Sequence, residues 1–110
     1  MERVFYKTPA YDKFYGSLNA RAQKKVKYII EHIRNERNLS TKFVKHLVNT
    51  DFYEMRISVD NEYRVIIFAI DNNNIMNAND IFLLNGFIKK STADYEKQIA
   101  IAQKIMEDML

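Results

Sequence analysis

Four basic residues stand at fixed places in three apolar, strand-like runs of this chain. Arg56 and Arg64 each interrupt such a run, and the pair Lys89 and Lys90 closes the third. An arginine in the middle of an otherwise buried strand is costly unless an anionic group meets it. Guanidinium groups also match phosphate oxygens in a bidentate manner. The pattern therefore predicts a binding site for a phosphate backbone.

The spacing of the two arginines predicts that they share one face of a β-hairpin. If the turn is centred on Asp60, Arg56 lies opposite Arg64, and Glu54 lies opposite Ile66 on the same face. Like charges directly opposite one another are unfavourable by a few tenths to about 1 kcal/mol. A fold tolerates that repulsion where a phosphate group lies between the two cations.

A plainer interpretation of both arginines is that each forms an ion pair within the protein. Glu54, Glu62 or a helix carboxylate could supply the partner. Each arginine alone suits this structural role better than a catalytic one. The combination of both arginines with Lys89 and Lys90 favours the functional interpretation.

His46 follows Lys45 directly before the hairpin, where it could overhang the basic face. A histidine there can carry a proton near neutral pH, and the alternative is a helix-end residue without a chemical role. The sequence has no ligand spacing for zinc or another metal, and its only glycines, Gly16 and Gly86, form no phosphate loop. Ser58 has no evident histidine partner, so serine nucleophile chemistry has no support.

Composition predicts one cysteine-free domain with a basic half. The chain has 110 residues, no cysteine and 47% hydrophobic residues, enough for a core over residues 1–110. Residues 1–50 carry 11 Lys and Arg against four Asp and Glu, whereas residues 51–110 carry six against ten. The basic half indicates contact with a polyanion such as nucleic acid, and the alternative is a solvated, lysine-rich helix surface. The apolar runs are too short to span a membrane and no signal segment is visible, so a cytoplasmic protein without membrane contact is expected.

The predicted element order is β-α-α-β-β-β-α, an α+β fold with helices against one face of a small, largely antiparallel sheet. Helices are expected at 10–18, at 20 to about 37 and after Ser91 and Thr92, helical turns at 41–48, and strands at 3–7, 53–57, 63–70 and 81–88. Asn19 is a good cap for the second helix, and Asp94 is placed for a capping-box contact with Ser91. The apolar stripe expected on the second helix is Ala22, Val26, Ile29, Ile30 and Ile33. The run 63–70 is almost continuously apolar, which is typical of a central strand.

The last helix carries an apolar stripe at alternating steps of four and three residues. Its members are Tyr95, Ile99, Ala102, Met106 and Met109. Such a stripe most often packs on its own sheet. The alternative is a docking face for a partner, to which methionine side chains adapt well.

Four segments, in their order along the chain, resemble the RelE/ParE toxin superfamily, most closely its HigB-like, phage-derived branch. They are residues 45–47, 53–56, 63–65 and 84–90. The resemblance implies a microbial-RNase-like fold, with a twisted antiparallel sheet, two N-terminal helices and a C-terminal helix. It also implies the toxin of a type II toxin–antitoxin pair. RelE and HigB relatives cleave mRNA in the ribosomal A site by attack of a ribose 2′-hydroxyl on the adjacent phosphodiester, without a metal or other cofactor.

The resemblance assigns the cations of the site. Arg56 and Arg64 match the cations that relatives carry on this hairpin, and Lys89 or Lys90 matches a cation at the end of the last strand. These groups would contact and stabilise the scissile phosphate.

The identity of the general base stays open. Glu54 falls where RelE carries a lysine that acts as base, so Glu54 itself or His46 is the candidate here. Tyr95 is the nearest residue in order to the tyrosine that RelE stacks on a base, but its helical spacing suits the core better.

The resemblance also implies partners. These are the ribosome, mRNA and an antitoxin, expected to be a HigA-like helix-turn-helix protein. Basic residues off the apolar stripe of the long helix, together with one before the hairpin, are expected to contact RNA: Lys24, Lys25, Lys27, Arg34 and Lys45. Alternatives are a ParE-like, non-enzymatic inhibitor of DNA gyrase and a catalytically silent nucleic-acid-binding domain.

Overall fold

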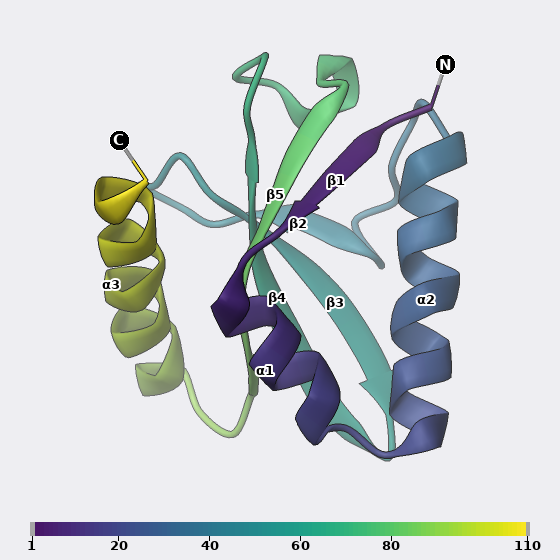
Figure 1. The fold of residues 1–110 in the computed structure, drawn as a ribbon, viewed down its shortest axis with the longest axis vertical. Helices are drawn as coiled ribbons and strands as arrows, with labels where there is room; N and C mark the ends of the chain where they lie inside the picture. Colours follow the sequence, from purple (N-terminus) through teal and green to yellow (C-terminus); the bar gives the residue numbers. More distant parts are fainter. Residues whose placement is uncertain (1, 110) are drawn as a thin grey trace.

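A five-stranded sheet separates two layers of helix in the computed structural model, which describes residues 2–109 (Figure 1). The elements are β1 (Val4–Lys7), α1 (Pro9–Ser17), α2 (Ala20–Asn35), β2 (Val44–His46), β3 (Tyr53–Val59), β4 (Asn61–Ala69), the short 3-10 helix η1 (Ile75–Asn77), β5 (Asp80–Ile88) and α3 (Ala93–Asp108). The strand order is β1-β5-β4-β3-β2, and only the β1–β5 pairing is parallel. The α+β fold class is confirmed, and β4 is the central strand as predicted.

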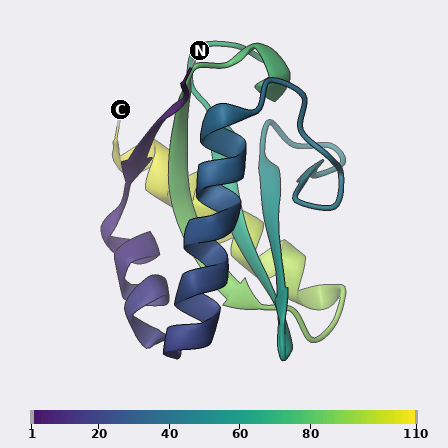
Figure 2. The same cartoon turned by 90° about the vertical axis from the view of Figure 1, so that its right-hand side faces the viewer.

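The helices cover both faces of the sheet. Turning the molecule by 90° places α2 in front of the strands and α3 behind them (Figure 2). The expectation that all helices gather on one face is therefore wrong. The reason lies in β4, where Val65, Ile66 and Ile67 are all fully buried, because consecutive side chains point to opposite faces and both faces are covered.

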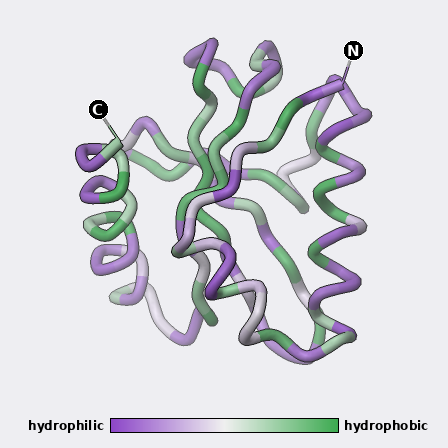
Figure 3. Tube along the Cα trace, in the orientation of Figure 1, coloured by the Kyte–Doolittle hydropathy of each residue, from purple (hydrophilic) through white to green (hydrophobic). Residues whose placement is uncertain are grey.

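Two hydrophobic cores result, one on each side of the sheet. The larger lies under α1 and α2, and the smaller lies under α3, with Leu84, Ile66 and Ala102 in its centre. Hydrophobic residues accordingly concentrate along the central strands, while α2 alternates between hydrophilic and hydrophobic segments (Figure 3).

Capping interactions fix the starts of the first two helices. Thr8 accepts a hydrogen bond from the backbone N–H of Tyr11 at 3.1 Å, and Pro9 occupies the first turn of α1. Asn19 accepts from the backbone N–H of Ala22 at 2.9 Å, as its position before α2 predicts. The five apolar positions predicted for the buried stripe of α2 are all buried: Ala22, Val26, Ile29, Ile30 and Ile33.

The β3–β4 hairpin has the predicted register. Arg56 pairs with Arg64 and Glu54 with Ile66. Asp60, at the turn, has a positive φ of 62°, a conformation that aspartate adopts more readily than most residues.

The segment 41–48 is not helical, which corrects the prediction of helical turns there. Residues Val44–His46 form the edge strand β2, which pairs antiparallel with β3. Lys45 and His46 therefore extend from a strand. The three-residue strand is too short to show an alternating pattern, so tertiary pairing decides its conformation.

The apolar stripe of α3 packs on the sheet along most of its length. Tyr95, Ile99 and Met106 contact the smaller core and Ala102 is fully buried, whereas Met109 is exposed. Before this helix, the Asp94 carboxylate accepts from the backbone N–H groups of Lys90 and Ser91, so the predicted contact with Ser91 is present.

Arg3, directly before β1, is a buried arginine, and no ion pair with a carboxylate of residues 2–109 is found for it. Its guanidinium donates to carbonyl oxygens at the end of α2 and around η1: Ile33, Glu36, Arg37, Ile75, Met76 and Ala78. Burial, and then the charge of Arg37, lower the pKa of Arg3. Within residues 2–109, no helix is both long and apolar enough to cross a membrane.

Candidate functional site

A cleft of about 400 Å3 opens on the α3 side of the sheet. It is lined by residues of β2 and the following turn, of β3, and of the start of α3: Lys45, His46, Leu47, Val48, Glu54, Arg56, Lys89, Thr92, Tyr95 and Ile99. Four of the six residues predicted for chemistry thus meet in one cavity, namely His46, Glu54, Arg56 and Lys89. The other two, Arg64 and Lys90, do not line it.

Arg64 is buried behind the cleft. Its side chain is only 3% exposed, and its guanidinium Nη1 donates to the carbonyl oxygen of Tyr63 at 2.9 Å and to Glu62 at 3.2 Å. Its Nε donates to the hydroxyl oxygen of Tyr95 at 3.1 Å. With these partners, Arg64 is placed to orient its neighbours and has little surface left for a phosphate.

Arg56 faces the cleft from the neighbouring strand. Its side chain is 31% exposed, and its Nη1 donates to the carbonyl oxygen of Thr41 at 3.4 Å. The Glu54 carboxylate lies close to both arginines, with Oε1 3.4 Å from Nε of Arg56 and 3.8 Å from Nε of Arg64. The ion pairs weighed as the plainer interpretation are therefore present, and a carboxylate reduces the repulsion between the two guanidinium groups.

Glu54 retains one unused oxygen. Its side chain is 4% exposed, and Oε2 has no hydrogen-bond partner among the described residues. A buried carboxylate oxygen without a partner is unusual because its lost hydration is not replaced. Glu54 lines the cleft, and its buried Oε2 is the atom of this carboxylate left without a hydrogen-bond donor.

Tyr95, in the first turn of α3, lies beside Glu54 and Arg64 and completes a cluster of three polar side chains with them. Burial, and then the nearby Glu54 carboxylate, raise the pKa of its hydroxyl, so Tyr95 stays protonated at neutral pH. Its ring packs edge-on against Phe87, with the ring centres 5.6 Å apart. Tyr95 both packs on the sheet and lines the cleft.

Lys89 approaches the cluster from the end of β5. Its Nζ lies 5.9 Å from the centre of the Tyr95 ring, and its backbone N–H donates to the carbonyl oxygen of Glu62 at 2.7 Å. Lys90 is exposed. Of the two lysines that the resemblance offered as the strand-end cation, the structure brings Lys89 into the cleft.

His46 has a tautomer fixed by its surroundings. Its Nε2 lies 2.7 Å from the carbonyl oxygen of Thr50, and a carbonyl can only accept, so Nε2 carries the proton. A neutral ring then leaves Nδ1 free to accept a proton. Lys45, the residue before it, pairs with Glu54 across β2 and β3 and is the third cation of the cleft lining, after Arg56 and Lys89.

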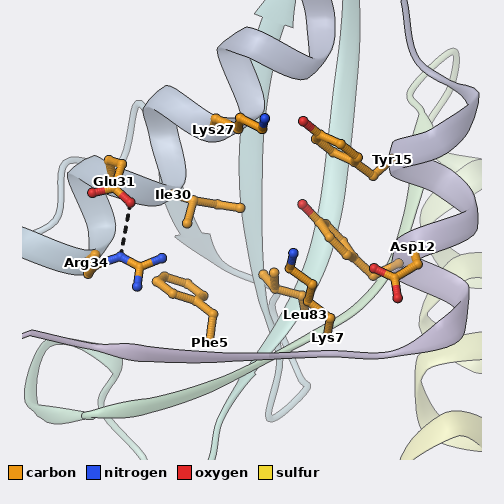
Figure 4. A pocket seen from close by; sticks show the side chains of 10 residues that line it. Phe5, Lys7, Asp12, Tyr15, Lys27, Ile30, Glu31, Arg34 and Leu83 are labelled. Atoms are coloured by element: carbon orange, nitrogen blue, oxygen red, sulfur yellow. Dashed lines mark ion pairs between the residues drawn. The ribbon is translucent and has the colours of Figure 1, made fainter.

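The basic residues of α2 lie on the opposite side of the sheet and fall into two groups. Lys27 and Arg34 line a cavity of about 340 Å3 between α1, α2 and β1 (Figure 4). There Arg34 forms an ion pair with Glu31 at 3.2 Å, and Lys7 joins the lining. Lys24 and Lys25 line a third, shallower cavity instead.

Three residues that were not predicted from the sequence join these two groups: Lys7, Arg21 and Tyr28. Arg21 and Tyr28 follow the same helical spacing as Lys24 and Lys25, and that spacing was the signal that could have revealed them. Lys7 lies on a different element, so only the fold brings it to Lys27. Within residues 2–109, no group of three or more His, Asp or Glu side chains is placed to hold a metal ion.

Comparison with models of protein families shows to which family this chain belongs. Residues 13–107 match the family described as Phage derived protein Gp49-like (DUF891). The chain belongs to this Gp49-like family. No curated protein sequence matches it.

The Gp49-like chain also matches a solved structure, that of the E. coli toxin RelE in the free state, determined for a mutant with two arginines changed to alanine. The TM-score is 0.64, sequence identity is 14%, and the match covers 100% of both chains. At this identity the likeness shows a shared fold. The phage-derived family and the RelE-like fold agree with the predicted resemblance to the RelE/ParE superfamily and its HigB-like, phage-derived branch.

Proposed function

We propose that this chain is a ribosome-dependent mRNA endonuclease acting as the toxin of a type II toxin–antitoxin pair. The observation that carries the proposal is that one cleft brings together His46 of β2, Glu54 and Arg56 of β3, and Lys89 at the end of β5. Two cations and two proton acceptors are the groups that phosphodiester transesterification needs.

Arg56 and Lys89 are the phosphate-contacting cations in this proposal. Both line the cleft, and both retain exposed surface. Charge develops on the phosphoryl oxygens as the bond to the attacking oxygen forms, and fixed cations stabilise that charge. Arg64 is a positioning residue, since its contacts with Tyr95 and Glu54 hold the carboxylate in place.

The general base is Glu54 or His46. The free Oε2 of Glu54 and the free Nδ1 of His46 can each accept the proton of a ribose 2′-hydroxyl. The hydroxyl oxygen then attacks phosphorus, and the bond to the 5′ oxygen breaks as that oxygen takes up a proton from the protonated base or from water. The products are a 2′,3′-cyclic phosphate and a 5′-hydroxyl.

The ribosome supplies substrate positioning, which is why so small a set of side chains is sufficient. Lys45 contacts the RNA beside the cleft, and the cations of α2 contact RNA beyond it, because they lie on the opposite face of the sheet. The proposed antitoxin is a HigA-like helix-turn-helix protein that neutralises the nuclease.

The test is a cleavage assay on mRNA with and without ribosomes, comparing the unmodified chain with Arg56→Gln. Cleavage that requires ribosomes, leaves 5′-hydroxyl ends and falls in Arg56→Gln supports the proposal. Lys97→Gln on the exposed side of α3 serves as the matched control. Intact mRNA under all conditions, together with inhibition of DNA gyrase, would favour the ParE-like alternative.

A further inference from the structure

Tyr28 is a large aromatic side chain on the outer face of α2, and it is 58% exposed. A single exposed aromatic residue is ordinary on a protein surface, so its neighbours decide its meaning. It lies in a shallow cavity of about 450 Å3 between the start of α2 and the β3–β4 hairpin. The lining residues are Arg21, Lys24, Lys25, Tyr28, Ser58 and Val59.

The charge around Tyr28 is unfavourable for the helix itself. The first turn of α2 contains no acidic residue, and Arg21 stands in it. A cation in the first turn opposes the helix dipole, so the charge of Arg21 does not serve helix stability. Arg21 forms an exposed ion pair with Asp60 at 3.5 Å, whereas Lys24 and Lys25 form none with any residue of the part of the chain that the structure describes.

The ring of Tyr28 is held in place although it is exposed. Nζ of Lys25 lies 5.2 Å from the ring centre, and Phe43 packs edge-on with its ring centre at 6.5 Å. An aromatic ring among cations is the combination by which proteins bind single-stranded nucleic acid, since bases stack on the ring and phosphates meet the cations.

A series of contacts through residues 41–43 links Tyr28 to Arg56, which lines the cleft on the other side of the sheet. Phe43, which contacts Tyr28, lies beside Lys42, whose Nζ is 5.6 Å from the Phe43 ring centre. The carbonyl oxygen of Phe43 accepts from the backbone N–H of Arg56 at 2.8 Å, and that of Thr41 accepts from the Arg56 side chain. Residues 41–43 thus connect the exposed ring with a cation of the cleft around the β2 edge of the sheet.

We infer that Tyr28 is a stacking platform for an unpaired base of the same RNA strand whose phosphate occupies the cleft. Arg21, Lys24 and Lys25 contact the phosphates beside that base, and Lys42 contacts the strand as it passes the β2 edge. The shortest dimension of the molecule is 24 Å, and single OB folds, which also bind single strands by stacking and phosphate contacts, accommodate about 4–16 nucleotides. This inference rests on the proposed function and adds a substrate contact outside the cleft.

The test measures binding of a fluorescent 2′-O-methyl oligouridylate of about 12 nucleotides, which the 2′-hydroxyl mechanism cannot cleave. Tyr28→Ala should raise the Kd by roughly tenfold, because one stacked base is lost, whereas Tyr28→Phe should stay within about twofold. Replacing Lys24 and Lys25 by Gln should reduce the salt dependence of log Kd by about 0.7 per cation lost. Tyr6→Ala is the matched control, since Tyr6 is a 44% exposed tyrosine on β1 at the opposite edge of the sheet.

Equal oligonucleotide affinity of Tyr28→Ala and the unmodified chain would overturn the platform, as would an equal loss in Tyr28→Phe. Weaker ribosome binding without any change in oligonucleotide binding would also overturn it, and would assign Tyr28 to ribosomal RNA. mRNA cleavage by the unmodified chain is measured in parallel. If oligonucleotide binding depends on Tyr28 but no mRNA is cleaved, the stacking platform is supported and the proposed nuclease activity is contradicted. If mRNA is cleaved but oligonucleotide binding does not depend on Tyr28, the nuclease activity is supported and the platform is contradicted.

Discussion

Arg56 and Arg64 are direct partners across β3 and β4, yet their side chains are 31% and 3% exposed. The difference arises because Tyr95 and Glu62 enclose Arg64, while Arg56 faces the cleft. Two residues that look equivalent along the sequence therefore have separable roles.

Replacing each arginine by glutamine should separate chemistry from stability. Arg56→Gln should lower the rate of mRNA cleavage on the order of 10²–10³-fold with little change in the free energy of unfolding, because a transition-state contact is lost. Arg64→Gln should lower the free energy of unfolding by about 3–5 kcal/mol, because the guanidinium it removes is itself buried and donates to Tyr63, Glu62 and Tyr95. Urea denaturation and single-turnover cleavage measure the two effects. Equal stability of both variants would contradict this assignment.

Glutamine substitutions also distinguish the two candidate bases. If Glu54 removes the proton, Glu54→Gln should slow the single-turnover rate strongly while ribosome binding is nearly unchanged. If His46 removes it, His46→Gln should give that result instead. Near-normal rates in both variants would leave positioning and electrostatic stabilisation as the sources of catalysis.

The two glycines should respond in opposite directions to alanine. A Cβ at Gly86 would lie 2.7 Å from Cε2 of Phe14, so Gly86→Ala should lower the free energy of unfolding by about 1–3 kcal/mol. A Cβ at Gly16 in α1 meets no atom within 4 Å, so Gly16→Ala should raise it by up to about 1 kcal/mol. Thermal unfolding checks both, and Phe14→Ala should reduce the effect of Gly86→Ala if the clash is the cause.

The hydrogen bonds of Asp94 should make the loop beside the cleft lose order at low pH. Hydrogen bonds from the backbone N–H groups of Lys90 and then Ser91 lower its pKa below the usual value of 3.8. Asp94 binds a proton less readily in the folded state than in the unfolded state. The stabilisation that its carboxylate gives to this loop is therefore present above the unfolded pKa and is lost as the pH falls through the folded pKa. Amide exchange of Lys90 and Ser91, corrected for its intrinsic pH dependence, should lose protection below about pH 3.8. In Asp94→Ala, the protection should already be reduced at neutral pH.

Met106 and Met109 test whether the α3 stripe serves the core. Met106 packs in the smaller core and Met109 is 42% exposed. Met106→Asp should therefore unfold the chain or lower its melting temperature strongly, while Met109→Asp should leave it folded. Co-purification of Met109→Asp with the proposed antitoxin would show whether this end of α3 also contacts that antitoxin.

Local patterns were enough to predict most of the fold. The α2 stripe, the Asn19 cap and the hairpin register each depend on neighbouring residues, and all are present as predicted. The side on which α3 packs was predicted wrongly, although the apolar run of β4 already indicated a strand buried on both faces.

The candidate site was less predictable because long-range packing decides which cations are accessible. Arg64 becomes buried only when α3 brings Tyr95 against it. Arg3 shows a second reason why the site was hard to predict. Backbone carbonyl oxygens accept the hydrogen bonds of this buried arginine, and no carboxylate among residues 2–109 forms an ion pair with it. An arginine in an apolar run therefore predicts a polar partner, and its position alone cannot say whether that partner is a ligand, a carboxylate or the backbone.

The parallel pairing of β1 with β5 sets the order in which a growing chain can become complete. Val4 pairs with Asp80, so the first strand waits for almost the last one, and Lys89 and Tyr95 follow later still. Contacts between residues so distant in sequence form late, because the intervening chain must first be ordered. A chain still being synthesised thus has no finished cleft until residues as late as Tyr95 have emerged from the ribosome.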